Sequence, residues 1–156
     1  MQTLRPLAVL ALTLAMGSGM SPEIAAAQSH EGHDAAVAAL VLNDGAKWQG
    51  DQNMIAGMTA IRDTMATNLD AIHTGTLSDD TAREITETVG SQVDFMIENC
   101  VLAPEVDEQF HLVLAQITDG TGLLEAGETE EGAVRIVQAV NAYGDHFQHP
   151  DWQPLD

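Results

Sequence analysis

Four stretches of this chain repeat apolar residues at steps of three and four, and short turn signals separate each stretch from the next. Such spacing places the apolar side chains on one face of an α-helix. The four apolar stripes are Met54, Met58, Ile61, Met65, Leu69 and Ile72; Ala82, Ile85, Val89, Val93, Met96 and Cys100; Val106, Phe110, Val113, Ile117 and Leu124; and Ala133, Ile136, Val140, Tyr143 and Phe147. Each stripe needs a packing partner, so the sequence predicts an all-α fold.

Capping and breaking residues predict where these helices begin and end. In chain order they are Asp51, Gly75, Ser78, Pro104, Gly127 and Pro150. Because the connections between consecutive helices are short, neighbouring helices are expected to be antiparallel. The sequence therefore predicts an up-down-up-down antiparallel four-helix bundle over residues 51–156, with the start of the first helix and the end of the second at the same pole.

The segment before the bundle has the pattern of an export signal. Residues 1–27 combine Arg5, a short apolar run over residues 7–16 and the small residues Ala25 to Ala27, which is typical of a cleaved signal peptide. Residues 28–50 form an N-terminal arm, flexible or weakly helical up to residue 42, with a turn at Asn43-Asp44-Gly45. No later run approaches about 20 apolar residues, so a soluble periplasmic protein without a membrane span is expected.

The net charge of the chain limits the classes of partner that it is expected to bind. Twenty-four acidic residues against five basic ones give a formal net charge of −19. Nucleic acids and anionic lipids are held mainly by Lys and Arg, so neither is an expected partner. The acidic residues are spread along the chain and predict a solvated surface that concentrates cations. The protein is expected to be monomeric or homodimeric.

One pole of the predicted bundle collects side chains that bind soft metal ions. Met54, Met58, Cys100, His111 and His146 all fall near this end, called here the Cys100 pole. Thiolate, thioether and imidazole together favour Cu(I), so a copper site is the leading hypothesis. Each residue also has a simpler interpretation. The two Met residues can fill the core, Cys100 can act as a small apolar residue, His111 can lie at the core boundary, and His146 can complement the helix dipole.

A second candidate metal site depends on the cleavage position. If the mature chain begins Gln28-Ser29-His30, its amine, two backbone amides and the His30 imidazole can surround Cu(II) or Ni(II) in a square plane. The alternative is an exposed tail that binds nothing.

Two short motifs resemble a known family. Asn53-Met54 opens the first predicted helix, and Asn141-Ala142-Tyr143 lies late in the fourth. On these motifs, residues 51–149 resemble the periplasmic b-type and c′-type cytochromes, which are four-helix bundles with haem near one pole. The resemblance implies the bundle topology and places Met54 where the b-type family has its Met haem ligand.

The haem ligands are not otherwise retained. Gly144 stands where the b-type pattern has its haem-ligating His, and the Cys-x-x-Cys-His motif of the c′-type family is absent. Haem is therefore less favoured than copper as a cofactor. Residues 42–48 also resemble uncharacterised exported bundle proteins that carry a single cysteine, a resemblance that implies fold and compartment only.

Catalytic motifs are missing from the sequence. It has no Gly-rich phosphate loop, no Gly-x-Ser-x-Gly, no His-Glu-x-x-His and no paired Glu-x-x-His. We therefore expect no enzymatic activity. Two classes stay open: a binding protein for copper or, less favoured, non-covalent haem, and a structural, interaction or stress-response bundle without a cofactor.

The export hypothesis gives a direct test. Intact-mass measurement of the exported protein should show a mature chain that starts at or next to Gln28, because small residues occupy the cleavage positions before it. A chain that keeps residues 1–27 would contradict both the signal peptide and the metal site at His30.

Overall fold

The computed structural model describes residues 39–156, so the predicted signal peptide, His30 and residues 28–38 of the predicted N-terminal arm lie outside the described residues. This part of the chain is all-helical and contains no strand. The helices are α2 (Gln52–Thr67), α3 (Leu69–His73), α4 (Asp79–Asn99), α5 (Pro104–Glu125) and α6 (Thr129–His146).

The four predicted stripes form the hydrophobic core. Every stripe residue is buried except Leu69 and Cys100, which are half-buried and pack against the core. The structure differs from the prediction in the first stripe, which is divided between α2 and α3. Asn68 interrupts it, and its side-chain amide donates to the carbonyl of Thr64 at 2.9 Å, a local bond that competes with a continuous helix.

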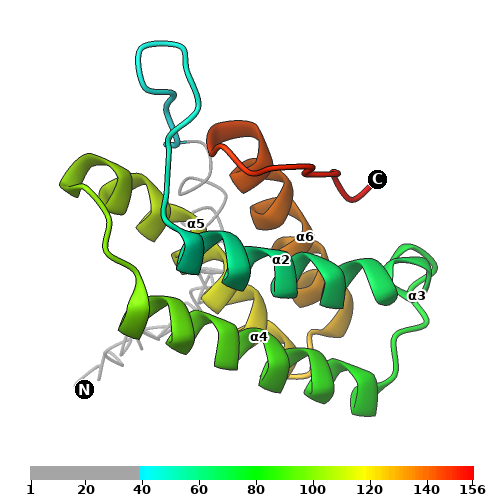
Figure 1. Ribbon diagram of the computed structural model, residues 1–156. Coiled ribbons are helices and arrows are strands. Elements are labelled where there is room, and N and C mark those ends of the chain that lie inside the picture. Colours follow the sequence, from blue (N-terminus) through cyan, green and yellow to red (C-terminus); the bar gives the residue numbers. More distant parts are fainter. Residues whose placement is uncertain (1–38) are drawn as a thin grey trace, which may run out of the picture.

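The helices pack in a closed series of neighbours. α2 and α4 lie side by side and run in opposite directions (Figure 1), α4 contacts α5, α5 contacts α6, and α6 returns to α2. The most extensive contact joins α5 to α6, where Gly120 faces Gly132. A Cβ atom on Gly120 would lie 2.9 Å from the carbonyl oxygen of Gly132, so these two helices approach backbone to backbone. The aromatic rings of Phe110, Tyr143 and Phe147 fill the adjoining core.

The segments on either side of the bundle meet at its end. Trp48 donates its backbone N–H to the carbonyl of His146 at 2.8 Å, and Gln148 donates to the carbonyl of Trp48 at 2.8 Å. The predicted turn is confirmed, with Asp44 at φ 48° and Gly45 at φ 87°. Residues 39–42 are not helical, and Leu40 is buried against the core.

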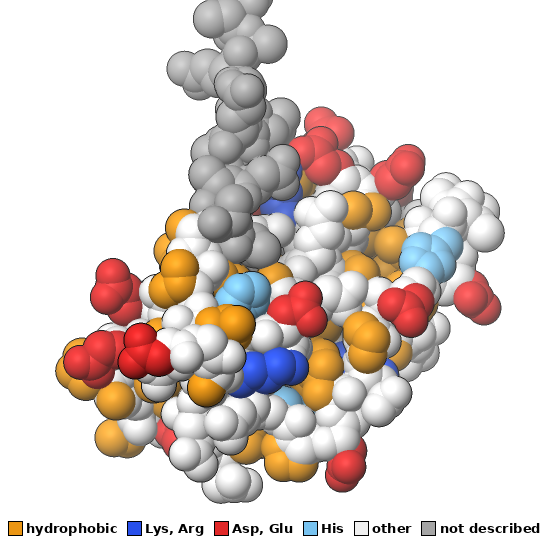
Figure 2. Space-filling model, turned by 90° about the horizontal axis from the view of Figure 1, so that it is seen from above, with side chains coloured by type: hydrophobic (Ala, Val, Ile, Leu, Met, Phe, Trp, Pro, Cys, Tyr) orange, Lys and Arg blue, Asp and Glu red, His pale blue; other side chains and the backbone are white. Residues whose placement is uncertain are grey.

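The charged side chains on the surface face shown in Figure 2 are mostly acidic, as the composition of the chain predicts. Acidic side chains are scattered over the face shown in Figure 2, with few Lys or Arg side chains between them. None of the described helices combines the length and the apolar character that a membrane crossing requires.

Asp51 ties the start of α2 to the end of α4. It is the N-cap of α2, as predicted, and one carboxylate oxygen accepts the N–H of Met54 at 2.8 Å. The other oxygen accepts the N–H of Val101 at 2.7 Å, beyond the end of α4. The amide of Asn53 reinforces this link by donating to the carbonyl of Asn99 at 2.7 Å. A single capping residue therefore fixes two helix ends at the Cys100 pole.

Because Asp51 bonds to two helix ends, replacing it should lower the free energy of unfolding more than replacing an ordinary N-cap does. Asp51→Ala should lower the free energy of unfolding by about 2 kcal/mol, because a typical cap contributes about 1 kcal/mol and a second backbone N–H also loses its acceptor. Ser78→Ala is the matched control, since Ser78 caps only α4 by accepting the N–H of Thr81 at 3.2 Å. Urea unfolding followed by circular dichroism would measure both. Equal losses would contradict the connecting role of Asp51.

Candidate functional site

Cys100 sits at the junction that Asp51 organises. It is the C-cap of α4, its backbone N–H donates to the carbonyl of Met96, and its thiol hydrogen-bonds the Asp51 carboxylate. The residue is half-buried, so it lies at the edge of the core and not within it. Because residue 101 turns away from the helix to reach Asp51, the thiol is held beside a carboxylate.

The surroundings of Cys100 strongly disfavour a bare thiolate. Burial, the charge of Asp51, the hydrogen bond to Asp51 and the charge of Asp107 raise the pKa of the Cys100 thiol to about 12. Burial alone would raise the pKa of Asp51, but hydrogen bonds from the N–H groups of Met54, Val101 and Asn53 and from the Cys100 thiol outweigh it and lower that pKa. At neutral pH the pair is therefore a thiol beside a carboxylate.

His111 lies beside Asp107, whose charge also acts on the Cys100 thiol. Its ring is largely exposed, and Nδ1 lies 2.9 Å from the Asp107 carbonyl oxygen and 3.4 Å from the Asp107 carboxylate. A carbonyl oxygen can only accept, so Nδ1 carries a proton, and in the neutral tautomer Nε2 is then the nitrogen with the free lone pair. Orientation of one ring nitrogen by a backbone carbonyl is typical of histidines that bind metals through the other nitrogen.

His146 adopts the same tautomer at the end of α6. Its Nδ1 lies 2.8 Å from the Ala142 carbonyl oxygen, which leaves Nε2 as the acceptor. Met54 and Met58 are fully buried in α2, with Met54 three residues after the Asp51 cap and Met58 one turn deeper. The Met54 side chain packs closely against Gly50.

Some of the predicted ligands are linked through Asp51 and Asp107, without forming a closed metal site. The Met54 backbone N–H and the Cys100 thiol both bond to Asp51, and His111 lies beside Asp107, whose charge acts on the thiol. Over residues 39–156, however, no three His, Cys, Asp or Glu side chains are arranged to hold a metal ion. His30 lies outside the described residues.

Sequence reasoning missed a hydrogen-bonded group around His149. Its Nδ1 lies 3.0 Å from the hydroxyl of Tyr143, and its Nε2 lies 3.1 Å from the hydroxyl of Thr59. His149 follows α6, outside any periodic stripe, so only the tertiary fold brings it to α2. The proline at position 150 marks the end of the helix but gives no sign of this contact.

Trp152 occupies the space beside Gly144. A Cβ atom on Gly144 would lie within van der Waals overlap of the Trp152 indole nitrogen, and the Trp152 ring also packs on Tyr143 with centroids 5.0 Å apart. Gly144 stands where the b-type cytochrome pattern carries a haem-ligating His. The indole therefore fills the place from which that ligand would extend, which disfavours haem.

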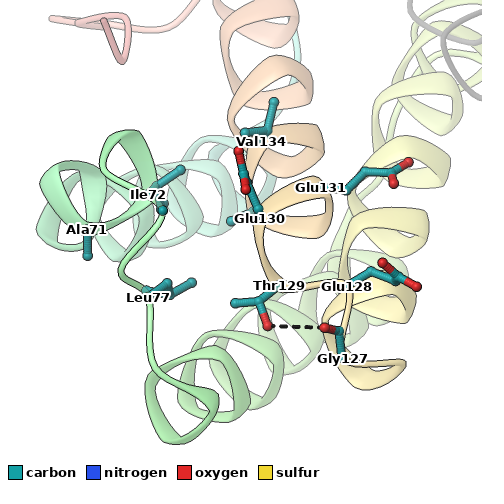
Figure 3. Close-up of a pocket in the computed structure, with 11 residues that line it drawn as sticks. Ala71, Ile72, Leu77, Gly127, Glu128, Thr129, Glu130, Glu131 and Val134 are labelled. Atoms are coloured by element: carbon teal, nitrogen blue, oxygen red, sulfur yellow. Dashed lines mark hydrogen bonds between the residues drawn. The ribbon is translucent and has the colours of Figure 1, made fainter.

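A hollow of about 600 Å³ lies at the other end of the molecule (Figure 3). Ile72 and Leu77 face the start of α6 across it, and Glu128 and Glu130 stand at its rim. None of the described candidate ligands lines this hollow. It therefore adds nothing to the site at the Cys100 pole.

Comparison of the chain with protein-family models, curated proteins and solved structures found no match.

The raised thiol pKa has a measurable consequence. Alkylation of Cys100 by iodoacetamide at pH 8 should be at least about tenfold slower than that of a free thiol, because the thiolate is the reacting form. The rate should still rise about tenfold per pH unit through pH 10, with no plateau near pH 9. Cys100 is the only cysteine, so mass spectrometry follows this one site. A plateau near the ordinary thiol pKa would contradict the described surroundings.

Proposed function

We propose that this protein is an exported four-helix bundle that binds one Cu(I) ion at the Cys100 pole. Cys100 and His111 are the principal ligands, and Met54, Met58 or His146 completes the coordination. The closed series of helix contacts is compatible with the up-down-up-down arrangement on which this pole depends. In this proposal the protein is a periplasmic metal-binding protein and not an enzyme.

The observation that carries the proposal is the half-buried Cys100 thiol beside the Asp51 carboxylate, on which the charge of Asp107 also acts. Burial and the charges of Asp51 and Asp107 all act against an isolated thiolate. A bound cation relieves each of these effects, because it neutralises the sulfur and is itself attracted by the carboxylates. A monovalent metal ion can therefore take the place of the thiol proton without leaving a bare thiolate in these surroundings.

The imidazole tautomers support the same proposal. His111 and His146 each direct Nδ1–H to a backbone carbonyl, so both offer Nε2 as a ligand. His111 is exposed, with 67% of its side chain accessible, and can turn toward sulfur at little cost in packing. Thiolate, imidazole and thioether form a donor set suited to Cu(I).

A second candidate function is that of an interaction bundle without a cofactor. Ile97 and Val101 lie beside Cys100 with 66% and 86% of their surface exposed, an unusual exposure for aliphatic side chains at one site. If the thiol is only a packing residue, this apolar edge offers a contact for another protein.

Competition against a chromogenic Cu(I) chelator tests the metal proposal. The reduced protein should bind about one Cu(I), with at least about a hundredfold weaker binding in Cys100→Ser and at least about tenfold weaker binding in His111→Ala. Affinity should rise with pH by up to tenfold per unit, because binding displaces the thiol proton.

Two controls identify the site. His73→Ala removes an exposed histidine in the last turn of α3 and should leave binding unchanged. Replacing His30 and His33 together should also have little effect, which separates the pole from the amino-terminal hypothesis. If Cys100→Ser competes as well as the wild-type protein, the metal proposal is wrong and the interaction bundle is favoured.

A further inference from the structure

We propose that residues 148–153 form a strap over α2 and α6 that a single proton on His149 opens. His149 is the central contact of this strap, and it bridges one helix to the other. This inference is independent of metal binding at the Cys100 pole.

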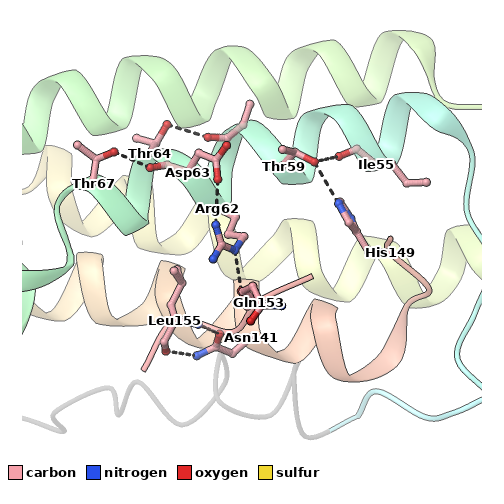
Figure 4. A network of polar contacts seen from close by, with 11 residues as sticks. Ile55, Thr59, Arg62, Asp63, Thr64, Thr67, Asn141, His149, Gln153 and Leu155 are labelled. Atoms are coloured by element: carbon pink, nitrogen blue, oxygen red, sulfur yellow. Dashed lines mark hydrogen bonds and ion pairs between the residues drawn. The ribbon is translucent and has the colours of Figure 1, made fainter. Parts of the chain in front are cut away.

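The direction of every hydrogen bond around His149 follows from its partners. The Thr59 hydroxyl donates to the carbonyl of Ile55 at 2.7 Å, so it must accept from His149 Nε2 (Figure 4). The neutral imidazole then has only Nδ1 as an acceptor, and the Tyr143 hydroxyl donates to it. The relay therefore runs one way, from Tyr143 through His149 and Thr59 to Ile55.

A second proton on His149 breaks this relay. With both ring nitrogens protonated, Nδ1 can only donate to the Tyr143 oxygen, which leaves the buried Tyr143 hydroxyl proton without an acceptor. This hydroxyl proton and the partly buried imidazolium near Arg62 are both costly, whereas a lifted strap lets water solvate both groups. Protonation thus favours the open strap.

The chain that follows the strap is held by groups that do not titrate. The amide of Asn141 exchanges two hydrogen bonds of 2.8 Å with the backbone of Leu155, and Leu155 is buried. Arg62 holds the strap itself by donating to the carbonyl of Gln153 at 2.6 Å (Figure 4), so this bond breaks when the strap opens. Because Phe147 and Leu155 are buried, opening is expected to be local, between these two residues.

Burial and the positive charge of Arg62 oppose the protonation of His149 in the closed form. Burial and the charge of Arg62 on α2 lower the pKa of His149. On α6 the neighbour is Tyr143, and Lys47 from the segment before α2 lines the same hollow as His149. Asp151 belongs to the strap itself and is exposed. Since the pKa is lowered on closing, closure is fully favoured above the ordinary His pKa of about 6.5 and is weakened as pH falls below it.

Trp152 supplies a reporter inside the strap. The centroids of the Trp152 and His149 rings lie 4.6 Å apart, and the indole nitrogen is buried without a hydrogen-bond partner. Opening of the strap should therefore expose the indole to solvent. The experiment uses the full mature chain with Trp48→Phe, which leaves Trp152 as the only tryptophan. Acrylamide quenching of its fluorescence is measured from pH 7.5 to 5.0, with far-UV circular dichroism to verify the helices.

Quenching should increase toward low pH in this parent protein, and the opening constant should rise by up to tenfold per unit below the ordinary His pKa. His149→Gln cannot be protonated and should abolish the pH dependence. Tyr143→Phe removes the donor to Nδ1, so the midpoint should move to higher pH. The matched control His73→Gln removes an exposed histidine on α3 and should keep the parent's midpoint.

Constant quenching in the parent from pH 7.5 to 5.0 would overturn the proposal. So would a transition that persists in His149→Gln with intact helices. If His149→Gln does not fold, Tyr143→Phe decides, because an unchanged midpoint in that variant would show that the relay does not sense the proton.

Discussion

The Asp51 carboxylate is the constraint on which the Cys100 pole depends. Its two oxygens accept backbone N–H groups from the start of α2 and from the turn after α4, and the Cys100 thiol adds a further bond. These bonds hold the pKa of Asp51 low, so the carboxylate is charged at neutral pH. Its structural contribution is present above the ordinary aspartate pKa of about 3.9 and is lost as pH falls through the folded-state value. The same charge that holds the helices together also sets the state of the thiol.

Local periodicity was sufficient to predict most of the fold. Apolar spacing and capping residues are properties of short stretches, and the stripes, the caps Asp51 and Ser78, and Pro104 in the first turn of α5 are confirmed. The break at Asn68 was not predicted, because it depends on a side chain that competes with the helix for a backbone carbonyl. Cys100 continues its stripe in the sequence, yet it falls one residue beyond α4 and is only half-buried.

The contacts of the candidate site were beyond the reach of sequence periodicity. Asp51 and Val101 are separated by 50 residues, and Thr59 and His149 by 90. Antiparallel topology predicts which helix ends share a pole, but it does not predict which side chain turns toward which. The sequence therefore predicts Asp51 only as a cap and gives no signal for the contacts of His149. Hydrogen-bond direction, which gives the His149 relay its meaning, depends on the complete set of partners and appears only in three dimensions.

The two proposals for this protein are electrostatically compatible. A bare thiolate at Cys100 would act on Tyr143, whose buried hydroxyl already has a raised pKa, and Tyr143 is the donor to His149. A protonated thiol and a Cu(I) thiolate carry the same net charge, so exchanging the proton for Cu(I) leaves the field at Tyr143 unchanged. A divalent ion would instead add a positive charge beside Asp51 and Asp107. Monovalent exchange can therefore proceed at the thiol without disturbing the hydroxyl that closes the strap.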